Sequence, residues 1–277
     1  MSGIYLVTLP IGNNEDISLR ALRTLKEIRN IYCEDTRIFK ELCKHIGVDY
    51  SEKRILSYHD HSGERNTEKI LGLAKLEPCI FVSDAGSPLI SDPAFPLIKG
   101  AIALDIPLFT IPGVSSVITA LELSGLAPIP FHFYGFLGRD KADLTNCVDL
   151  VKSSYGTHIF FEGKSRILKT LAVLSNELAD FDFALGRELT KTYESMYRFK
   201  GKEFDQIKEQ IVEKGEYVLL ISNGQKSASG GTDKALVDLA NTILEKGSKP
   251  KVLAKLLSEI TGKPTKEVYE TLTKTRQ

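Results

Sequence analysis

Along the first half of the chain, short apolar runs typical of strands alternate with segments in which apolar residues recur at helical spacing. Residues 3–9 (GIYLVTL) form an apolar run that ends at Pro10, which is typical of a strand. Segment 17–28 follows, and Asp16 or Ser18 is expected to cap it as a helix. Its apolar residues recur at steps of three, the spacing of one helix face: Leu19, Leu22, Leu25 and Ile28.

The same alternation of apolar runs and helical spacing predicts four more strand–helix units. We expect strands at 30–33, 54–58, 79–83 and 107–111, and helices at 36–45, 64–76, 94–104 and 114–123. Strict alternation of strands and helices implies a parallel sheet with helices on both faces. Nearly all-apolar strands such as CIFV (79–82) fit burial on both sides.

The pattern changes after GLAPIP (125–130), where Gly and Pro cluster, so a domain joint is predicted there. Beyond it we expect strands at 157–161, 181–185, 193–199 and 216–222, and helices at 166–178 and 203–214. Two consecutive strands with no helix between them indicate an antiparallel or mixed sheet. The tail from about residue 232 predicts three short helices. The expected division is therefore 1–125, 126–230 and 231–277.

Length and composition change this picture little. The 277 residues suit two domains of ordinary size, and 42% hydrophobic residues are ample for packed interiors. No stretch approaches the roughly 18 apolar residues of a membrane span, and no basic segment precedes an apolar run at the N-terminus. We therefore expect a cytoplasmic protein with no membrane contact.

Cysteine usage and charge narrow the chemistry further. The four cysteines are scattered without a CxxC pair, which disfavours disulfides and a structural metal, and Cys33 and Cys79 are expected in the core. Lys plus Arg and Asp plus Glu are equal at 36 each. Any contact with nucleic acid must therefore come from a local basic face.

The sequence lacks four common motifs of nucleotide-binding and hydrolytic enzymes: GxxxxGK[ST], GxGxxG after the first strand, HExxH and GxSxG. In an open α/β sheet, ligands bind beyond the carboxyl ends of the strands. The loops expected there are rich in Gly, Pro and Asp: TLPIGNNED, CEDTR, YHDHSGER, VSDAGSPLISDP and IPGVSS. We expect a ligand site at this edge.

Two of these loops favour a cofactor. In SDAGSP (83–88), small residues allow close approach of the backbone, and Asp84 can accept hydrogen bonds from ribose hydroxyls or an ammonium. The alternative is a tight turn closed by Asp and Pro. In IPGVSS (111–116), free backbone N–H groups and two hydroxyls suit an anion or a carboxylate. Ordinary helix capping by Ser115 or Ser116 is the alternative.

Two other loops carry candidate catalytic and substrate groups. Glu34 in CEDTR is expected in the cleft, where desolvation would fit it for proton abstraction, while Asp35 or Thr36 would cap the next helix. His59 and His61 lack a nearby third ligand, so a metal site is not expected. We interpret them as surface or substrate-contacting residues.

The loops also form a recognisable set. TLPIGNNEDISLRAL, CEDTR, SYHDH, VSDAGSPLISDP, IPGVSSVITALELSGL, FYGFLGR, IFFEGKSRI and GRELTKTYES occur in this order. Together they resemble the ribosomal RNA small-subunit methyltransferase I family of the tetrapyrrole methylase superfamily. The resemblance runs from about Ile4 to Gly201 and extends to ITGKPTKEVYETL in the tail. This family commonly has Ser-Pro-His-Arg where the chain has Gly163-Lys164-Ser165-Arg166.

The resemblance implies a two-domain α/β fold of tetrapyrrole-methylase type, with a mainly parallel N-terminal sheet, a mixed C-terminal domain and a helical tail. It implies S-adenosylmethionine in a cleft, a homodimer, and 2'-O-methylation of a cytidine in the decoding region of 16S ribosomal RNA or of the small ribosomal subunit. Carried over by motif, the cofactor residues are Pro10, Asp84, Ala85, Gly86, Ser115, Ser116, Phe161 and Leu189.

Candidate catalytic residues in the loops of this cleft are Glu34, Asp35 and Glu162, one of which would take or orient the proton of the ribose hydroxyl. RNA contact is expected from Arg37, Lys40, Lys44, Arg65, Arg139, Lys141, Lys164 and Arg166, with His59 beside them. Two alternatives stay open. One is a small-molecule methyltransferase of the superfamily that acts on a tetrapyrrole, and the other is a non-catalytic RNA- or ribosome-binding module.

Overall fold

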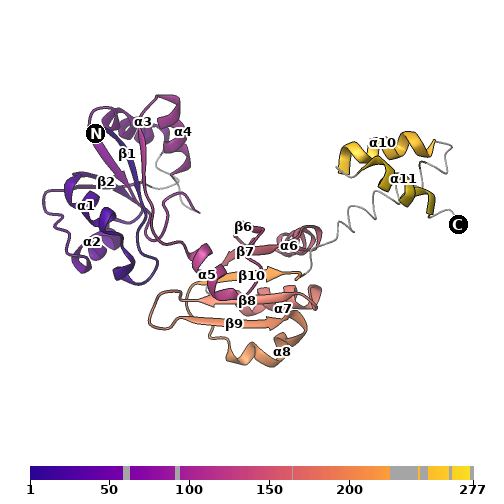
Figure 1. Ribbon diagram of the computed structural model, residues 1–277. Coiled ribbons are helices and arrows are strands. Elements are labelled where there is room, and N and C mark those ends of the chain that lie inside the picture. The colour runs from indigo at the N-terminus through magenta and orange to yellow at the C-terminus, as the bar shows by residue number, and fades with distance from the viewer. Residues whose placement is uncertain are drawn as a thin grey trace. The chain divides into compact units, whose positions relative to one another are not determined.

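The computed structural model describes residues 1–58, 63–90, 94–163, 165–224, 243, 249–261 and 264–274. The chain separates into two compact units (Figure 1). The first contains residues 1–151 and 156–224, and the second contains residues 152–155 and 225–277. Among the described residues, no helix combines the length and apolar character needed to cross a membrane.

The first sheet is fully parallel, with strand order β3-β2-β4-β1-β5. Its strands are β1 (Gly3–Val7), β2 (Asn30–Cys33), β3 (Arg54–Ser57), β4 (Pro78–Phe81) and β5 (Leu108–Ile111). The connecting helices are α1 (Leu19–Glu27), α2 (Thr36–His45), α3 (Gly63–Ala74) and α4 (Phe95–Ala103). The predicted alternation is thus confirmed, with the β2 and α2 boundaries matching to the residue.

Alternating strand residues bury both faces of this sheet. Ile31 and Cys33 pack in the core under α1 and α2, whereas Tyr32 packs in the core under α3 and α4. Helices therefore cover both faces, as Figure 1 shows. All four cysteines are free and buried, and burial raises the pKa of the Cys33 thiol to about 12. The expected core role of Cys33 and Cys79 is confirmed.

Helix α1 corrects one detail of the pattern. Ser18 caps it, its hydroxyl accepting from the Ala21 N–H at 3.1 Å, so the second of the two predicted caps is the one used. Leu19 was expected on the buried face but is 83% exposed. It is the first helical residue, and Ala21, Thr24 and Leu25 occupy the buried positions instead.

The second sheet is mixed, with strand order β6-β7-β10-β8-β9. Its strands are β6 (Phe131–Phe136), β7 (Thr157–Glu162), β8 (Asp182–Arg187), β9 (Ser195–Lys200) and β10 (Tyr217–Ser222). Strands β6 and β7 are parallel, and the remaining pairs are antiparallel. The predicted fold class, a mainly parallel sheet followed by a mixed one, is confirmed.

Helices lie on both faces of the second sheet as well. One core joins it to α6 (Lys141–Ser153), α7 (Ile167–Glu177) and α8 (Phe204–Ile207). On the other face, α5 (Ser116–Ser124) buries Val117, Ala120 and Leu121 against β7, β8 and β10. Helix α5 thus follows the last strand of the first sheet in sequence but packs on the second. The proposed limits 1–125, 126–230 and 231–277 stay a prediction.

The predicted helix at 203–214 is wrong. The chain forms only α8, between two short 3-10 turns at Gly201–Glu203 and Lys208–Gln210. Beyond these turns, the Tyr217 hydroxyl donates to the Val212 carbonyl, and Arg187 donates to the Lys214 carbonyl at 2.6 Å. The second unit contains α10 (Pro250–Thr261) and α11 (Thr265–Lys274). A third tail helix was expected in a segment mostly outside the described residues.

Candidate active site

Backbone hydrogen bonds join the loops at the carboxyl edge of the first sheet. The β1 loop and the SDAGSP loop bond each other twice, Leu9 N–H to the Gly86 carbonyl (3.0 Å) and Gly86 N–H to the Leu9 carbonyl (3.1 Å). Gly86 has φ +68°, a conformation that L side chains rarely adopt. The Asp35 N–H donates to Asp84 Oδ1 at 2.9 Å, which joins the β2 loop to the same turn. The turn predicted as an alternative is present, and it also presents its backbone to a cavity.

A cavity of about 510 Å³ opens beside these loops. It is lined by residues of both sheets: Ile11, Glu34, Asp84, Ala85, Gly86, Ser87, Ile90, Ser115, Ser116, Phe136, Phe161, Glu162, Gly163, Leu189, Lys191, Glu216, Tyr217 and Val218. Residues far apart in sequence therefore meet at one site, with apolar side chains, carboxylates and hydroxyls on its walls. Its volume falls within the range of small-molecule and cofactor sites.

Most of the predicted cofactor residues lie on this cavity. Asp84, Ala85, Gly86, Ser115, Ser116, Phe161 and Leu189 all line it, whereas Pro10, which precedes the lining residue Ile11 in sequence, is buried and does not line it. Ser115 is the N-cap residue of α5, yet its side chain makes no capping hydrogen bond. The first backbone N–H groups of α5 and the two serine hydroxyls are therefore placed to bind a polar ligand group at the cavity wall.

The three predicted catalytic carboxylates differ in surroundings. Glu34 lines the cavity and is half-buried. Asp35 caps α2 through the Arg37 N–H (2.8 Å) and pairs with the Arg37 guanidinium at 2.6 Å. The hydrogen bonds from Arg37 hold the pKa of the Asp35 carboxyl well below its usual range. Asp35 is therefore a weak proton acceptor, and it does not line the cavity.

Glu162 lines the cavity, but its carboxylate is fully buried and holds the β7 loop together. It accepts from Arg166 at 2.6 Å, from the Thr170 hydroxyl at 2.6 Å and from the Gly163 N–H at 2.6 Å. Arg166 also donates to the Leu137 carbonyl, so its guanidinium is used within the protein. Both ends of this ion pair are engaged in positioning the loop.

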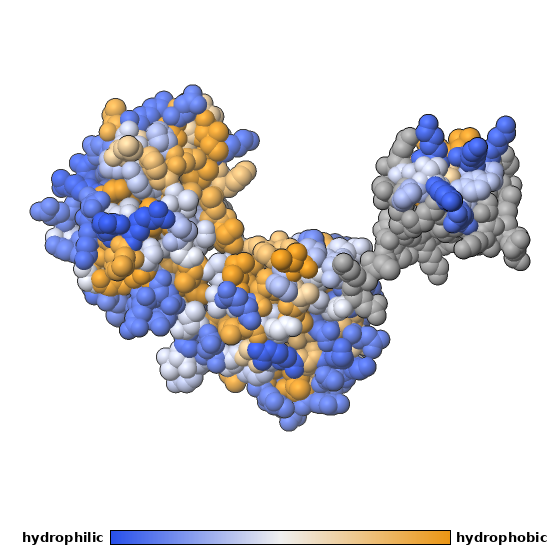
Figure 2. Space-filling view, in the orientation of Figure 1, coloured by the Kyte–Doolittle hydropathy of each residue, from blue (hydrophilic) through white to orange (hydrophobic). Residues whose placement is uncertain are grey.

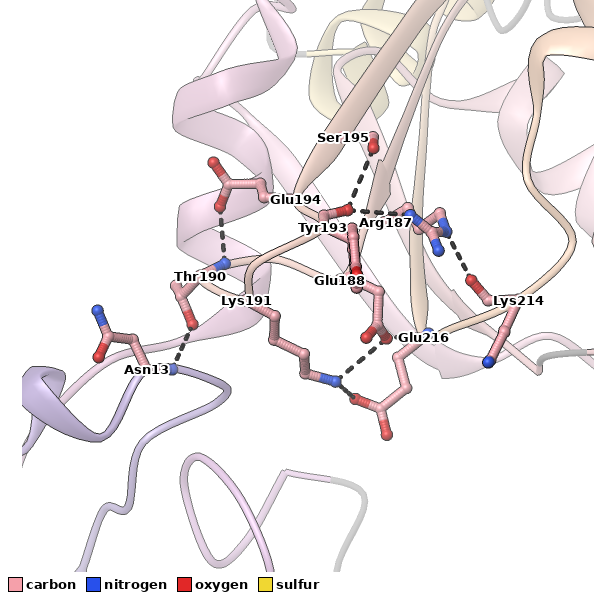
Figure 3. A network of polar contacts seen from close by, with 10 residues as sticks. All are labelled: Asn13, Arg187, Glu188, Thr190, Lys191, Tyr193, Glu194, Ser195, Lys214 and Glu216. Atoms are coloured by element: carbon pink, nitrogen blue, oxygen red, sulfur yellow. Dashed lines mark hydrogen bonds and ion pairs between the residues drawn. The ribbon is translucent and has the colours of Figure 1, made fainter. Parts of the chain in front are cut away.

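Figure 3 shows a second polar network in the loop between β8 and β9. Lys191 pairs with Glu188 (3.2 Å) and with Glu216 (2.8 Å), and the Glu216 N–H donates to Glu188 at 2.8 Å. Burial lowers the pKa of Lys191, but the bonds to Glu216 and Glu188 outweigh it and raise that pKa. The cavity wall thus carries a firmly protonated ammonium between two carboxylates.

The same loop contacts the β1 loop directly. The Asn13 N–H donates to Thr190 Oγ1 at 3.0 Å, and the Thr190 N–H donates to Glu194 at 2.7 Å (Figure 3). Glu188 and Thr190 adopt positive φ angles of 50° and 64°, which non-glycine residues rarely adopt. Strained backbone held by surrounding bonds is common at functional sites.

The sequence patterns missed several lining residues. Phe136 is 64% exposed at the cavity, where a β-bulge between Phe133 and Phe136 shifts the register of β6, and its ring lies 5.4 Å from that of Phe161. Glu216 directly precedes β10 and Tyr217 begins it, and the antiparallel pairing of β10 with β8 brings this end of the strand to the cavity. No local signal marks them. Phe136 lies in the FYGFLGR motif, but the sequence of that motif alone predicted no role for it.

None of the predicted RNA-contacting residues that the structure describes lines the cavity, and their expected place beside it stays a prediction. Arg139 is exposed and Arg37 is 88% exposed in its side chain, and neither lines it. His59 and Lys164 lie outside the described residues. Within the described ranges, no three His, Cys, Asp or Glu side chains are grouped as metal ligands.

Comparison with known proteins shows which family this chain belongs to. Residues 3–205 match the family model of the tetrapyrrole (corrin/porphyrin) methylases, which is most of the chain. The chain belongs to the tetrapyrrole methylase family. A Bacillus subtilis relative named ribosomal RNA small subunit methyltransferase I is 34% identical over 276 residues, covering 98% of this chain and 94% of the relative. A relative of the same name from Hydrogenobaculum is 40% identical over 221 residues, covering 79% of this chain and 95% of the relative, so it is a shorter protein.

Solved structures share the fold. The uroporphyrin-III C-methyltransferase from Thermus thermophilus, crystallised with S-adenyl homocysteine, superposes with a TM-score of 0.54. It is 17% identical and covers 79% of this chain and 97% of its own. At that identity the likeness concerns the fold alone. It agrees with the two-sheet architecture of the first unit.

Proposed function

We propose that this protein transfers the methyl group of S-adenosylmethionine to the 2'-hydroxyl of a cytidine in the decoding region of 16S ribosomal RNA. The names of the curated relatives support a methyltransferase that acts on small-subunit ribosomal RNA. The observation that carries the proposal is the cavity where the strand-end loops meet residues of the second sheet. Apart from Glu162, whose carboxylate is buried and paired with Arg166, the described residues that line it include three acidic residues and one lysine: Glu34, Asp84, Glu216 and Lys191.

This charge balance fits the methyl donor. When bound, S-adenosylmethionine supplies an electrophilic methyl group on a positively charged sulfur. An excess of carboxylates on a partly desolvated wall favours a cation over an anion. The backbone at Gly86 and the hydroxyls of Ser115 and Ser116 would hold its polar ends, while Ile11 and Leu189 exclude water. The chemistry of the wall therefore fits this cofactor.

For the ribose hydroxyl, Glu34 is our candidate proton acceptor. It lines the cavity and is half-buried, whereas Asp35 does not line the cavity and the Glu162 carboxyl is fully buried. A positioned base contributes about 10²- to 10⁴-fold to the rate. The exposed ring of Phe136 at the cavity offers a surface on which the cytidine base would stack.

Mapping of 2'-O-methyl groups in 16S ribosomal RNA tests the function. Mass spectrometry of RNA from cells with and without the gene should show one cytidine that loses its 2'-O-methyl group, and the purified protein with S-adenosylmethionine should restore it. An unchanged map would contradict the proposal. Methyl transfer to a tetrapyrrole and not to the RNA would point to the small-molecule chemistry of the superfamily instead.

Substitution of Glu34 tests the proposed base. Glu34→Gln should lower kcat about 100-fold or more, because the amide cannot accept the proton, while affinity for S-adenosylmethionine by calorimetry changes less than about threefold. Glu41→Gln is the matched control, since Glu41 lies on α2 with an exposed carboxylate and does not line the cavity. Equal turnover in the two variants would remove Glu34 from the chemistry.

Two further parts of the proposal concern the location of the enzyme in the cell and its oligomeric state. A ribosomal substrate implies a cytoplasmic location, which cell fractionation would test. We also propose a homodimer, and sedimentation equilibrium should give twice the 30.7 kDa of one chain. A single-chain mass at micromolar concentration would contradict it.

A further inference from the structure

The neutral total charge conceals an uneven distribution. Residues 225–277 contain ten Lys and Arg against six Asp and Glu, a net charge of +4. Because the whole chain has 36 of each, residues 1–224 contain 26 basic and 30 acidic residues, a net charge of −4. The positive part coincides with the second unit, and the negative part contains the cavity. Charge asymmetry of this kind is typical of chains that bind nucleic acid through one segment.

The two described helices of the second unit leave a basic face exposed. On α10, Leu253, Ala254 and Leu257 are buried in a small core with Val268 and Leu272 of α11. The residues of α10 that point away from this core are exposed: Lys251, Val252, Lys255 and Leu256, preceded by the exposed Lys249. In Figure 2, hydrophilic side chains lie beside apolar atoms on the described surface of this unit. We call Lys249, Lys251 and Lys255 the α10 lysines.

Helix stability does not explain where these lysines lie. Lys249 and Lys251 flank the first residue of α10, Pro250, and the first turn of that helix has no acidic residue. A cation near a helix N-terminus opposes the macrodipole, so the positions of Lys249 and Lys251 are unfavourable for the isolated α10 helix. An anionic partner on this face would compensate for that placement.

We infer that the α10 lysines form a surface that binds the phosphate backbone of the RNA substrate. This inference rests on the proposed function. The cavity wall has more acidic than basic residues, so it offers little attraction to an RNA backbone, whereas the second unit has an excess of positive charge. The α10 lysines lie outside the unit that contains the cavity, so this surface acts in substrate affinity and takes no part in methyl transfer.

The test neutralises the α10 lysines in the full chain. Lys249→Gln, Lys251→Gln and Lys255→Gln are combined, and binding to small ribosomal subunits is measured as a function of salt. The matched control combines Lys75→Gln, Lys99→Gln and Lys169→Gln, three exposed lysines of the first unit. It removes the same charge, so a general loss of attraction would affect both variants equally.

Each phosphate contact contributes about 0.7 to 0.9 to the slope of log affinity against log salt. The α10 variant should therefore show a slope smaller by about 2 to 3 and an affinity at least tenfold lower than that of the control. Affinity for S-adenosylmethionine and kcat at saturating subunit concentration should remain those of the wild type.

Unchanged affinity and slope relative to the control would overturn the inference while leaving the proposed function intact. A salt-independent loss of affinity, reproduced by Val252→Ser and Leu256→Ser, would mean that this face docks on a ribosomal protein, which also overturns it. A wild-type protein that neither binds nor methylates subunits would contradict the proposed function itself.

Discussion

At the scale of single residues, Glu162 shows how a motif residue can hold a loop in place. Its carboxylate is completely buried, and three donors from β7's own loop and from α7 surround it. A buried charge of this kind is tolerated only when its hydrogen bonds are satisfied. The sequence predicted its place beside the cavity correctly, but its partners became visible only in the folded chain.

Substitution of Glu162 therefore tests stability as well as catalysis. Glu162→Gln should lower the free energy of unfolding by about 2 to 3 kcal/mol, because an amide cannot accept from all three donors and leaves Arg166 without its counter-charge. Thr170→Val, which removes one donor, should cost about 1 to 2 kcal/mol. Urea unfolding measures both. A Glu162→Gln protein as stable as the wild type but inactive would instead assign the carboxylate to the chemistry.

At the scale of elements, the contact between the β1 loop and the loop after β8 depends on one glycine. A Cβ at Gly12 would lie 2.5 Å from Lys191 Cγ, 2.7 Å from Thr190 Oγ1 and 2.9 Å from the Leu189 carbonyl. Two of these residues, Lys191 and Leu189, line the cavity. The close approach of the two loops therefore fixes part of the cavity wall.

Gly12→Ala should push these loops apart. We expect a loss of about 1 to 3 kcal/mol in unfolding free energy from overpacking, together with an at least tenfold weaker affinity for S-adenosylmethionine. Gly72→Ala is the control, because a Cβ there meets nothing within 4 Å and Gly72 lies inside α3. That variant should gain about 0.5 to 1 kcal/mol and bind normally. Normal cofactor affinity in Gly12→Ala would show that the loop contact does not shape the site.

Helices and strands were predicted correctly from the sequence where the spacing of apolar residues matches the pattern of buried positions. The all-apolar strands of the first sheet are buried on both faces, so their runs stand out, and β2 and α2 were predicted to the residue. Strand β6 was missed because it lies at a sheet edge, where three of its six residues are exposed and none is fully buried, and because its register shifts between Phe133 and Phe136. Helix α6 was also missed, although Leu144, Cys147, Val148 and Val151 have helical spacing.

At the scale of the whole molecule, the site depends on long-range topology that no local pattern contains. The strand-end rule placed Glu34, Asp84 and Ser115 at one edge of the first sheet, and all three line the cavity. Lys191 and Glu216 reach it only through the antiparallel register of the second sheet. The cofactor side was thus more predictable than the wall built by the second sheet.

Shared residues also couple the stabilities of the two sheets. Helix α5 directly follows the first sheet but packs on the second, and the Asn13–Thr190 bond joins their loops. A ligand that binds the native cavity should therefore stabilise both together. S-adenosylhomocysteine at 100 times its Kd should add about 2.7 kcal/mol to the unfolding free energy. The transition of the first unit should shift as a single step when followed by calorimetry. A calorimetric profile in which only one of two separate transitions moves would show that the sheets unfold independently and that one of them alone holds the ligand.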